Sequence, residues 1–211
     1  VVMLHDFSFR SPEEILAGLG GPAAHGAGSS TGMMAHGAHG GNAMANMGGM
    51  GGMAGMVHAN DVDYDAFLAN DRTLADPEVL TVEPGARVRL RIINGATATA
   101  FWVRTGDLAA TCVAVDGMTC RAVTATAFPI AQGQRLDLVV AMPKDGGAFP
   151  VLAQVEASRR QTGIILASPG ATVARIADLA ADEAPHLDLS LDLALSVPEP
   201  AGTPAALAGH H

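Results

Sequence analysis

The segment DPEVLTVEPGARVRLRIINGA, residues 76–96, shows a pattern that much of the chain repeats. At residues 87–93 arginine alternates with valine, leucine and isoleucine. Successive side chains of a strand point to opposite faces, so this alternation predicts a strand with a solvated arginine face and a buried apolar face. The preceding Glu83-Pro84-Gly85 predicts a proline-led turn. The segment therefore predicts two strands joined by a tight turn.

Outward from this segment, short apolar runs separated by turn residues recur at intervals of roughly ten residues. Gln132-Gly133 and Gly146-Gly147 supply positive φ, and Asn70-Asp71 suits a tight hairpin. The pattern predicts an all-β chain folded as an antiparallel sandwich over residues 61–168. The expected strands are residues 64–68, 78–82, 87–93, 100–103, 110–115, 122–130, 135–141, 149–156 and 163–167.

The first nineteen residues are expected to belong to the same sandwich. Residues 1–4 form an apolar run typical of a strand, and a short helix is expected over residues 12–19. Its start is indicated by Ser11 as N-cap, proline at the first helical position and acidic residues in the first turn. The chain begins inside a strand pattern, so we expect it to be cut from a longer protein.

Residues 169–211 are expected to form a linker towards a following domain. The pattern predicts one helix at residues 172–181 and an edge or linking strand at residues 186–197, where leucine alternates with aspartate and serine. Prolines and glycine then follow as in a linker. The terminal His210-His211 could be native or part of a purification tag, so it carries no functional argument.

Residues 20–60 differ sharply from the rest, because they consist almost entirely of Gly, Ala, Met, His, Ser and Asn. Such a segment cannot bury enough side-chain surface to offset its backbone entropy, which predicts a long disordered insertion. Its length exceeds that of ordinary connections, which marks either a function or inert low complexity. We refer to residues 20–60 as the Met/His insertion.

Thioether sulfur and imidazole are soft or intermediate donors that suit Cu(I), and a glycine-rich chain could gather two or three of them around one ion. The alternatives are low-complexity drift, or a helix in which each glycine would cost about 1 kcal/mol. The candidate transient Cu(I) ligands are His25, Met33, Met34, His36, His39, Met44, Met47, Met50, Met53, Met56 and His58.

Several stretches together resemble the second domain of three-domain bacterial multicopper oxidases. They are residues 1–7, 63–70, 76–96, 115–117 and 133–140. The resemblance implies a cupredoxin-like Greek-key β-sandwich and a periplasmic or secreted setting. It also implies flanking cupredoxin domains as partners, and copper as the cofactor of a parent oxidoreductase that couples one-electron substrate oxidation to reduction of dioxygen to water.

The ligand patterns of such an oxidase are absent from this sequence. Neither a His-x-His pair nor a His-Cys-His run occurs, and Cys112 and Cys120 have no histidine neighbours. No catalytic or resident cofactor-binding residue is therefore assigned, as suits a copper-free middle domain that does not turn over substrate alone. His5 is expected in a turn and Trp102 in the sandwich core.

A two-residue turn at Asp116-Gly117 would place Cys112 opposite Arg121 and Cys120 opposite Val113. In that register the two sulfurs need not meet. The sequence leaves a disulfide open, and favours two small buried apolar side chains.

The formal charge of −9, with few clustered basic residues, disfavours nucleic-acid binding. No apolar run approaches the length of a membrane span. Two other hypotheses stay open beside the oxidase domain. One is an autonomous copper-binding or copper-tolerance module, and the other is a β-sandwich interaction domain without metal.

Overall fold

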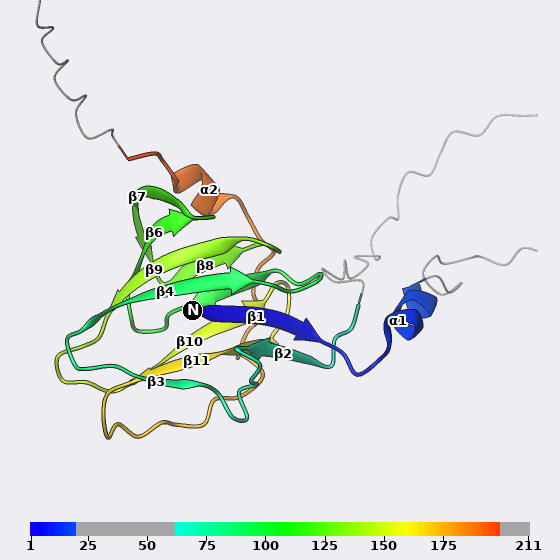
Figure 1. Cartoon of the computed structure of the whole chain (residues 1–211), viewed down its shortest axis with the longest axis horizontal. Coiled ribbons are helices and arrows are strands. Elements are labelled where there is room, and N and C mark those ends of the chain that lie inside the picture. The colour runs from blue at the N-terminus through cyan, green and yellow to red at the C-terminus, as the bar shows by residue number, and fades with distance from the viewer. Residues whose placement is uncertain (20–61, 199–211) are drawn as a thin grey trace, which may run out of the picture. The chain divides into compact units, whose positions relative to one another are not determined.

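The computed structural model describes residues 1–19 and 62–198, which fall into two compact units that we treat separately. The first unit, Val1–Phe9 with Ala59–His211, is a sandwich of a six-stranded and a five-stranded sheet (Figure 1). The six-stranded sheet has the order β2 (Ala66–Ala69), β1 (Val2–Phe7), β4 (Arg87–Asn94), β9 (Arg135–Ala141), β6 (Ala110–Val115) and β7 (Met118–Ala125). The five-stranded sheet has the order β3 (Val79–Thr81), β11 (Gln161–Ala167), β10 (Ala148–Val155), β5 (Phe101–Arg104) and β8 (Ala127–Ile130). The predicted all-β, cupredoxin-like class is confirmed.

Most strand pairs are antiparallel, and β4 shows why these residues form strands. Its arginines are exposed while Leu90 and Ile92 are buried, as the alternation predicted. The turn before it closes through a hydrogen bond from the Ala86 amide to the Glu83 carbonyl at 3.1 Å, with Gly85 at a φ of 74°. Two pairs are parallel, β1 with β4 and β11 with β3.

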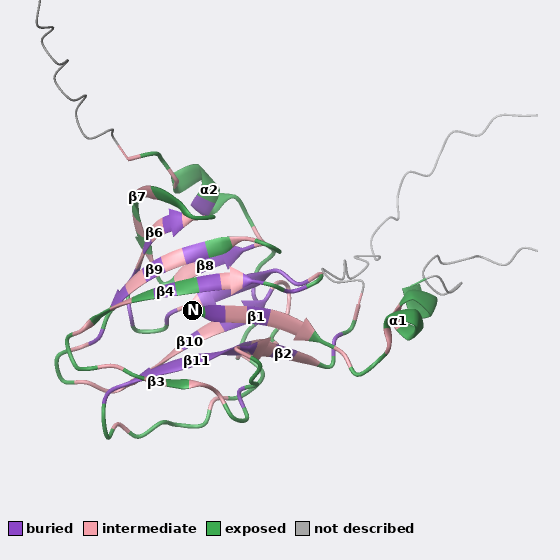
Figure 2. Ribbon diagram, viewed as in Figure 1, coloured by how far each residue is buried: buried purple, intermediate pink, exposed green. Residues whose placement is uncertain are grey.

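The core is built from buried residues of strands in both sheets, and Figure 2 colours the buried stretches purple. Phe101, Ile130, Leu138 and Ile164 are fully buried, and each such side chain contributes about 1.5–3 kcal/mol relative to exposure. Trp102 is buried, but it lies outside the core cluster that contains its neighbours Phe101 and Val103, and its indole N–H donates to the carbonyl of Pro185 at 2.9 Å. A buried tryptophan thus keeps its one donor satisfied.

The expected single strand at residues 122–130 is wrong, because the chain changes sheet there. Thr126 separates β7, in the six-stranded sheet, from β8, in the five-stranded sheet. The Thr126 carbonyl accepts a hydrogen bond from the Thr105 amide at 2.9 Å at this corner. Strand propensity is continuous across the corner, so no turn residue marks it in the sequence.

Both elements expected beyond residue 169 are also wrong. Residues 172–181 contain no helix, and the Gln161 and Ala180 amides instead hydrogen-bond the carbonyls of Asp178 and Arg159. Residues 186–197 contain the helix α2 (Ser190–Ala194) rather than a strand. Helical spacing places Leu191 and Leu195 on one side, where both pack against the core.

The helix α1 (Pro12–Leu19) belongs to the second unit, Arg10–His58, and has the predicted bounds. The Glu14 amide donates to the Ser11 hydroxyl at 3.2 Å, and the Ser11 amide donates to the Glu14 carboxylate at 2.7 Å. This reciprocal pair is a capping box, which satisfies donors that a helix start leaves free. The Met/His insertion, residues 20–60, which was predicted to be disordered, lies outside the described residues.

Replacing Asn94 by alanine should lower the free energy of unfolding by about 3 kcal/mol. Its buried amide donates to the carbonyls of Thr99 at 2.9 Å and Ile130 at 3.2 Å, and accepts from the Ala96 amide at 3.0 Å. Urea denaturation measures the loss. The exposed Asp145→Ala should change stability by less than about 0.5 kcal/mol, and equal effects of the two variants would contradict the assignment.

Candidate functional site

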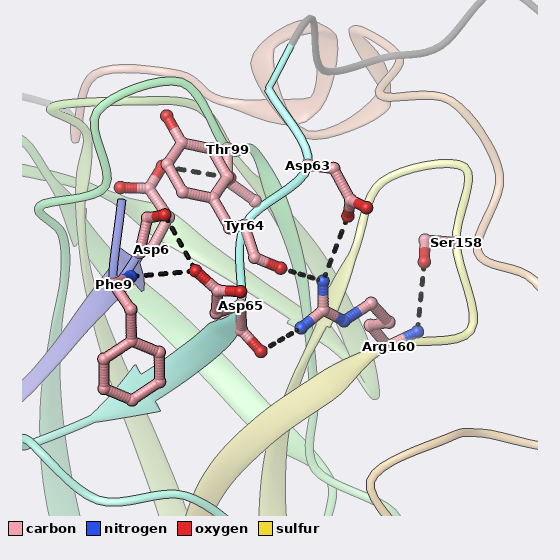
Figure 3. A network of polar contacts seen from close by, with 9 residues as sticks. Asp6, Phe9, Asp63, Tyr64, Asp65, Thr99, Ser158 and Arg160 are labelled. Atoms are coloured by element: carbon pink, nitrogen blue, oxygen red, sulfur yellow. Dashed lines mark hydrogen bonds and ion pairs between the residues drawn. The ribbon is translucent and has the colours of Figure 1, made fainter. Parts of the chain in front are cut away.

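The β1–β2 pair forms a stem at which the chain leaves the sandwich unit after Phe9 and pairs with it again at Ala66. Phe7 lies opposite Ala66, and the Asp65 amide donates to the Phe7 carbonyl at 2.9 Å. The carboxylate of Asp65 then accepts from the Ser8 hydroxyl and from the Phe9 amide, both at 2.8 Å (Figure 3). Residues 8 and 9, where the chain leaves the sandwich unit, are therefore held next to residue 65, where it returns. We call residues 5–9 and 62–67 the stem.

Arg160, in the turn between β10 and β11, holds the returning half of the stem. Its guanidinium donates to the carbonyl of Tyr64 and, at 2.8 Å, to that of Asp65 (Figure 3). The Ser158 hydroxyl accepts from the Arg160 backbone amide at 3.1 Å and so fixes the turn that carries the arginine. One side chain thus satisfies two carbonyls at a point where the β1–β2 ladder has ended.

The stem is joined to the core through aromatic rings. The Arg160 guanidinium carbon lies 4.5 Å from the centre of the Phe67 ring, which is a cation–π contact. Phe67 packs edge to face against Phe101, with ring centres 5.9 Å apart. The ion pair of Arg160 with Asp63 is longer, at 3.7 Å, and Asp63 is almost fully exposed. Exposed pairs contribute little, so the backbone hydrogen bonds and ring contacts carry the attachment.

Asp6 ties the outgoing half of the stem to the loop after β4. Its carboxylate accepts from the amides of Thr97 and Ala98, both at 2.9 Å, and from the Thr99 hydroxyl at 3.0 Å. Burial alone would raise the pKa of Asp6, but these donors outweigh it and the pKa is lowered. The pKa of Tyr64 is raised, first by burial and then by the negative charge of Asp6.

The donor atoms of the described residues do not form a metal centre. Residues 1–19 and 62–198 contain no group of three or more His, Cys, Asp or Glu side chains placed to hold an ion. His5 lies within β1 rather than in the expected turn. His186 is exposed, with its Nδ1 3.3 Å from a carboxylate oxygen of Glu156. The candidate Cu(I) ligands of the Met/His insertion all lie outside the described residues.

The cysteines are free thiols, and their predicted register is wrong. Cys112 lies opposite Val123 rather than Arg121, because the β6–β7 pairing shifts between Cys112 and Ala114. Burial and the neighbouring Cys120 raise the pKa of Cys112 to about 12. A thiol that stays protonated is a poor metal ligand, since the thiolate is the binding form.

A family model described as multicopper oxidase matches residues 28–171, which is more than half of the chain. The chain belongs to the multicopper oxidase family. Membership implies copper as the cofactor of the parent enzyme. The donor set of residues 1–19 and 62–198 does not fit a copper centre of this family, because imidazole and thiolate ligands are not brought together there.

Curated relatives match only part of their length. The chain is 32% identical over 96 residues to multicopper oxidase MmcO of Mycobacterium tuberculosis, which covers 46% of this chain and 19% of the relative. Copper resistance protein A of Escherichia coli is 39% identical over 71 residues, covering 34% of this chain and 11% of that protein. The matched part is therefore about a fifth or less of each of these two relatives.

Solved structures agree on the fold. Fet3p, described as a multicopper oxidase that functions in iron import, superposes with a TM-score of 0.59 at 13% identity, over 89% of this chain and 31% of that one. The laccase from Botrytis aclada gives a TM-score of 0.55 at 18% identity, over 86% of this chain and 30% of the laccase. Over residues 1–19 and 62–198 the chain has no helix with the length and hydropathy of a membrane span.

Arg160 was not identified from the sequence, where it stands only as one half of a basic pair. Arg160→Met should lower the free energy of unfolding by about 2 kcal/mol, because two carbonyls lose their donor. Amide hydrogen exchange should rise in the stem. Arg87→Met, on the exposed face of β4, is the control. Equal exchange in the stem of both variants would show that Arg160 does not hold it.

Asp6 should make the free energy of unfolding depend on pH in the acid range. Its lowered pKa means that the folded state favours the carboxylate, so its contribution is complete above the unfolded pKa of about 4 and is lost as the pH falls through the folded pKa. The stability difference between the native chain and Asp6→Asn should therefore shrink below about pH 4. Urea denaturation at a series of pH values measures it, and a constant difference would refute the assignment.

Proposed function

We propose that this chain is the middle, copper-ligand-free cupredoxin domain of a multicopper oxidase. The parent enzyme would oxidise a substrate or Cu(I) and reduce dioxygen to water, with its copper ions held by flanking cupredoxin domains. The observation that carries this proposal is a sandwich of the oxidase family whose described residues contain no clustered metal donors. The partial coverage of longer relatives also supports it.

In this proposal the domain is a structural spacer. Residues 61–168 supply the sandwich together with the strand in residues 1–19, and residues 169–211 lead to a following domain. The fully buried apolar core supports this role, because a close-packed interior is hard to deform and can therefore hold flanking domains at a fixed separation. A periplasmic or secreted location fits relatives that are named copper resistance proteins.

The Met/His insertion is proposed to capture Cu(I) transiently. Its methionines and histidines are soft and intermediate donors, separated by only a few residues. The stem supports this function because Asp65 and Arg160 fix residues 8–9 and 64–65, from which the chain runs towards the insertion on either side. Thioethers need no deprotonation, so capture should persist at about pH 5, apart from the histidine contribution.

An anaerobic Cu(I) titration against a chromophoric competitor tests the capture. Replacing the insertion methionines by leucine and its histidines by glutamine keeps length and bulk, and should weaken Cu(I) binding roughly tenfold or more. Met118→Leu is the matched control, since this methionine is 75% exposed on β7 and outside the insertion. Undiminished binding by the substituted insertion would contradict the proposed capture.

A further inference from the structure

A bulge between β6 and β7 brings the two cysteines together. Next to the turn the strands pair regularly, with Val115 opposite Met118 and Ala114 opposite Thr119. Continued in that register, Cys120 would lie opposite Val113. The pairing instead shifts, so that Cys112 lies opposite residue 123, and the three residues 120–122 of β7 face the single residue Val113 of β6. Such a bulge changes the direction of a side chain.

The re-aimed Cys120 side chain lies against Cys112. Its Sγ donates to the Cys112 carbonyl oxygen at 3.9 Å, and Cys120 packs against the core cluster of which Cys112 is a buried member. The Cys112 thiol is directed to the Ala114 carbonyl at 3.7 Å. These are the two cysteines of the sequence. Contact between them therefore depends on the bulge, which the sequence pattern did not show.

The two thiols differ in access to solvent. Cys112 is fully buried, whereas Cys120 is only partly buried on the edge strand β7. An oxidant in solution can therefore reach Cys120 first, and Cys112 can react only with a group already attached to Cys120. We propose that Cys112 and Cys120 form an intrachain disulfide across this bulge, made by exchange with a small-molecule disulfide. The inference does not depend on the proposed copper function.

The reaction proceeds by two exchange steps. The Cys120 thiolate, after losing its proton to solvent, attacks the small disulfide, forms a mixed disulfide and releases one small thiol. The Cys112 sulfur loses its proton and attacks the Cys120 sulfur, which forms the protein disulfide and releases the second small thiol. Two protein thiols are oxidised and one small disulfide is reduced to two thiols.

The second step should be the slow one. Burial first, and the neighbouring Cys120 second, raise the pKa of Cys112 to about 12, so little thiolate is present at neutral pH. A mixed disulfide at Cys120 has no ionisable thiol, so the second of these causes no longer acts on Cys112. The mixed disulfide on Cys120 is therefore the expected intermediate.

The disulfide would also stabilise the surface on which the C-terminal segment packs. The Arg121 amide, next to Cys120, donates to the Ser196 carbonyl at 2.8 Å, and Leu195 packs against the same core as Cys120. Cross-linking the bulge would restrict β7, an edge strand, in the position that makes these contacts. Exchange of amide hydrogens at residues 190–198 should slow on oxidation.

The test uses the full chain equilibrated with oxidised glutathione, quenched with an alkylating reagent and digested with trypsin. Arg104 and Arg121 bound one tryptic peptide, residues 105–121, that contains both cysteines. The disulfide predicts that this peptide loses two hydrogens and takes up no alkyl group. Two alkylated thiols, a stable glutathione adduct on the native chain, or a cross-linked dimer of the peptide would each overturn the proposal.

Single variants check the order of the steps. Cys112→Ser should retain one glutathione on Cys120, and Cys120→Ser should retain a free, slowly alkylated thiol at Cys112. Rapid modification of Cys112 in Cys120→Ser would contradict the order. The loss of two hydrogens from the native peptide decides the proposal without relying on either variant to fold.

Discussion

The antiparallel pairing of β1 with β2 is the constraint on which the rest of the molecule depends. It places Phe7 opposite Ala66 and fixes β1 where it also pairs with β4. Closing a loop costs entropy that grows slowly with its length, by about 0.6 kcal/mol for each doubling. Once the ladder, Asp65 and Arg160 hold the two ends, a long insertion adds little further cost. One chain can therefore combine a packed sandwich with the Met/His insertion.

The sandwich and the insertion carry different kinds of side chain. The interior of the sandwich is mainly apolar, with hydrogen-bonded exceptions such as Asn94, and among residues 1–19 and 62–198 the histidines are His5 and His186. The stem has polar contacts, but Asp6 and Arg160 use them to satisfy backbone amides and carbonyls rather than to face a ligand. The proposed spacer and the proposed copper capture follow from this separation of packing residues and donor residues.

Local patterns gave the strands, the capping box of α1 and the turns at Asn70-Asp71 and Asp116-Gly117, where φ is positive as such hairpins require. Alternation and turn chemistry depend on neighbouring residues, so a sequence displays them. The corner at Thr126 and the helix α2 were missed, because strand propensity and a leucine repeat each fit more than one structure. The contact of Arg160 with Tyr64 depends on how strands distant in the sequence are arranged, and the contact of Cys120 with Cys112 depends on a bulge. No local sequence pattern encodes either contact.

The most direct test of the central claim is to load the purified chain with Cu(II) and record its visible absorption and electron paramagnetic resonance spectra. A sandwich without a resident copper centre predicts no intense thiolate-to-copper charge-transfer band, because Cys112 is a buried, protonated thiol without imidazole neighbours. Only weak signals of loosely held Cu(II) should be seen. A strong blue band with the matching resonance signal would contradict the account, since it would place a mononuclear copper site within this domain.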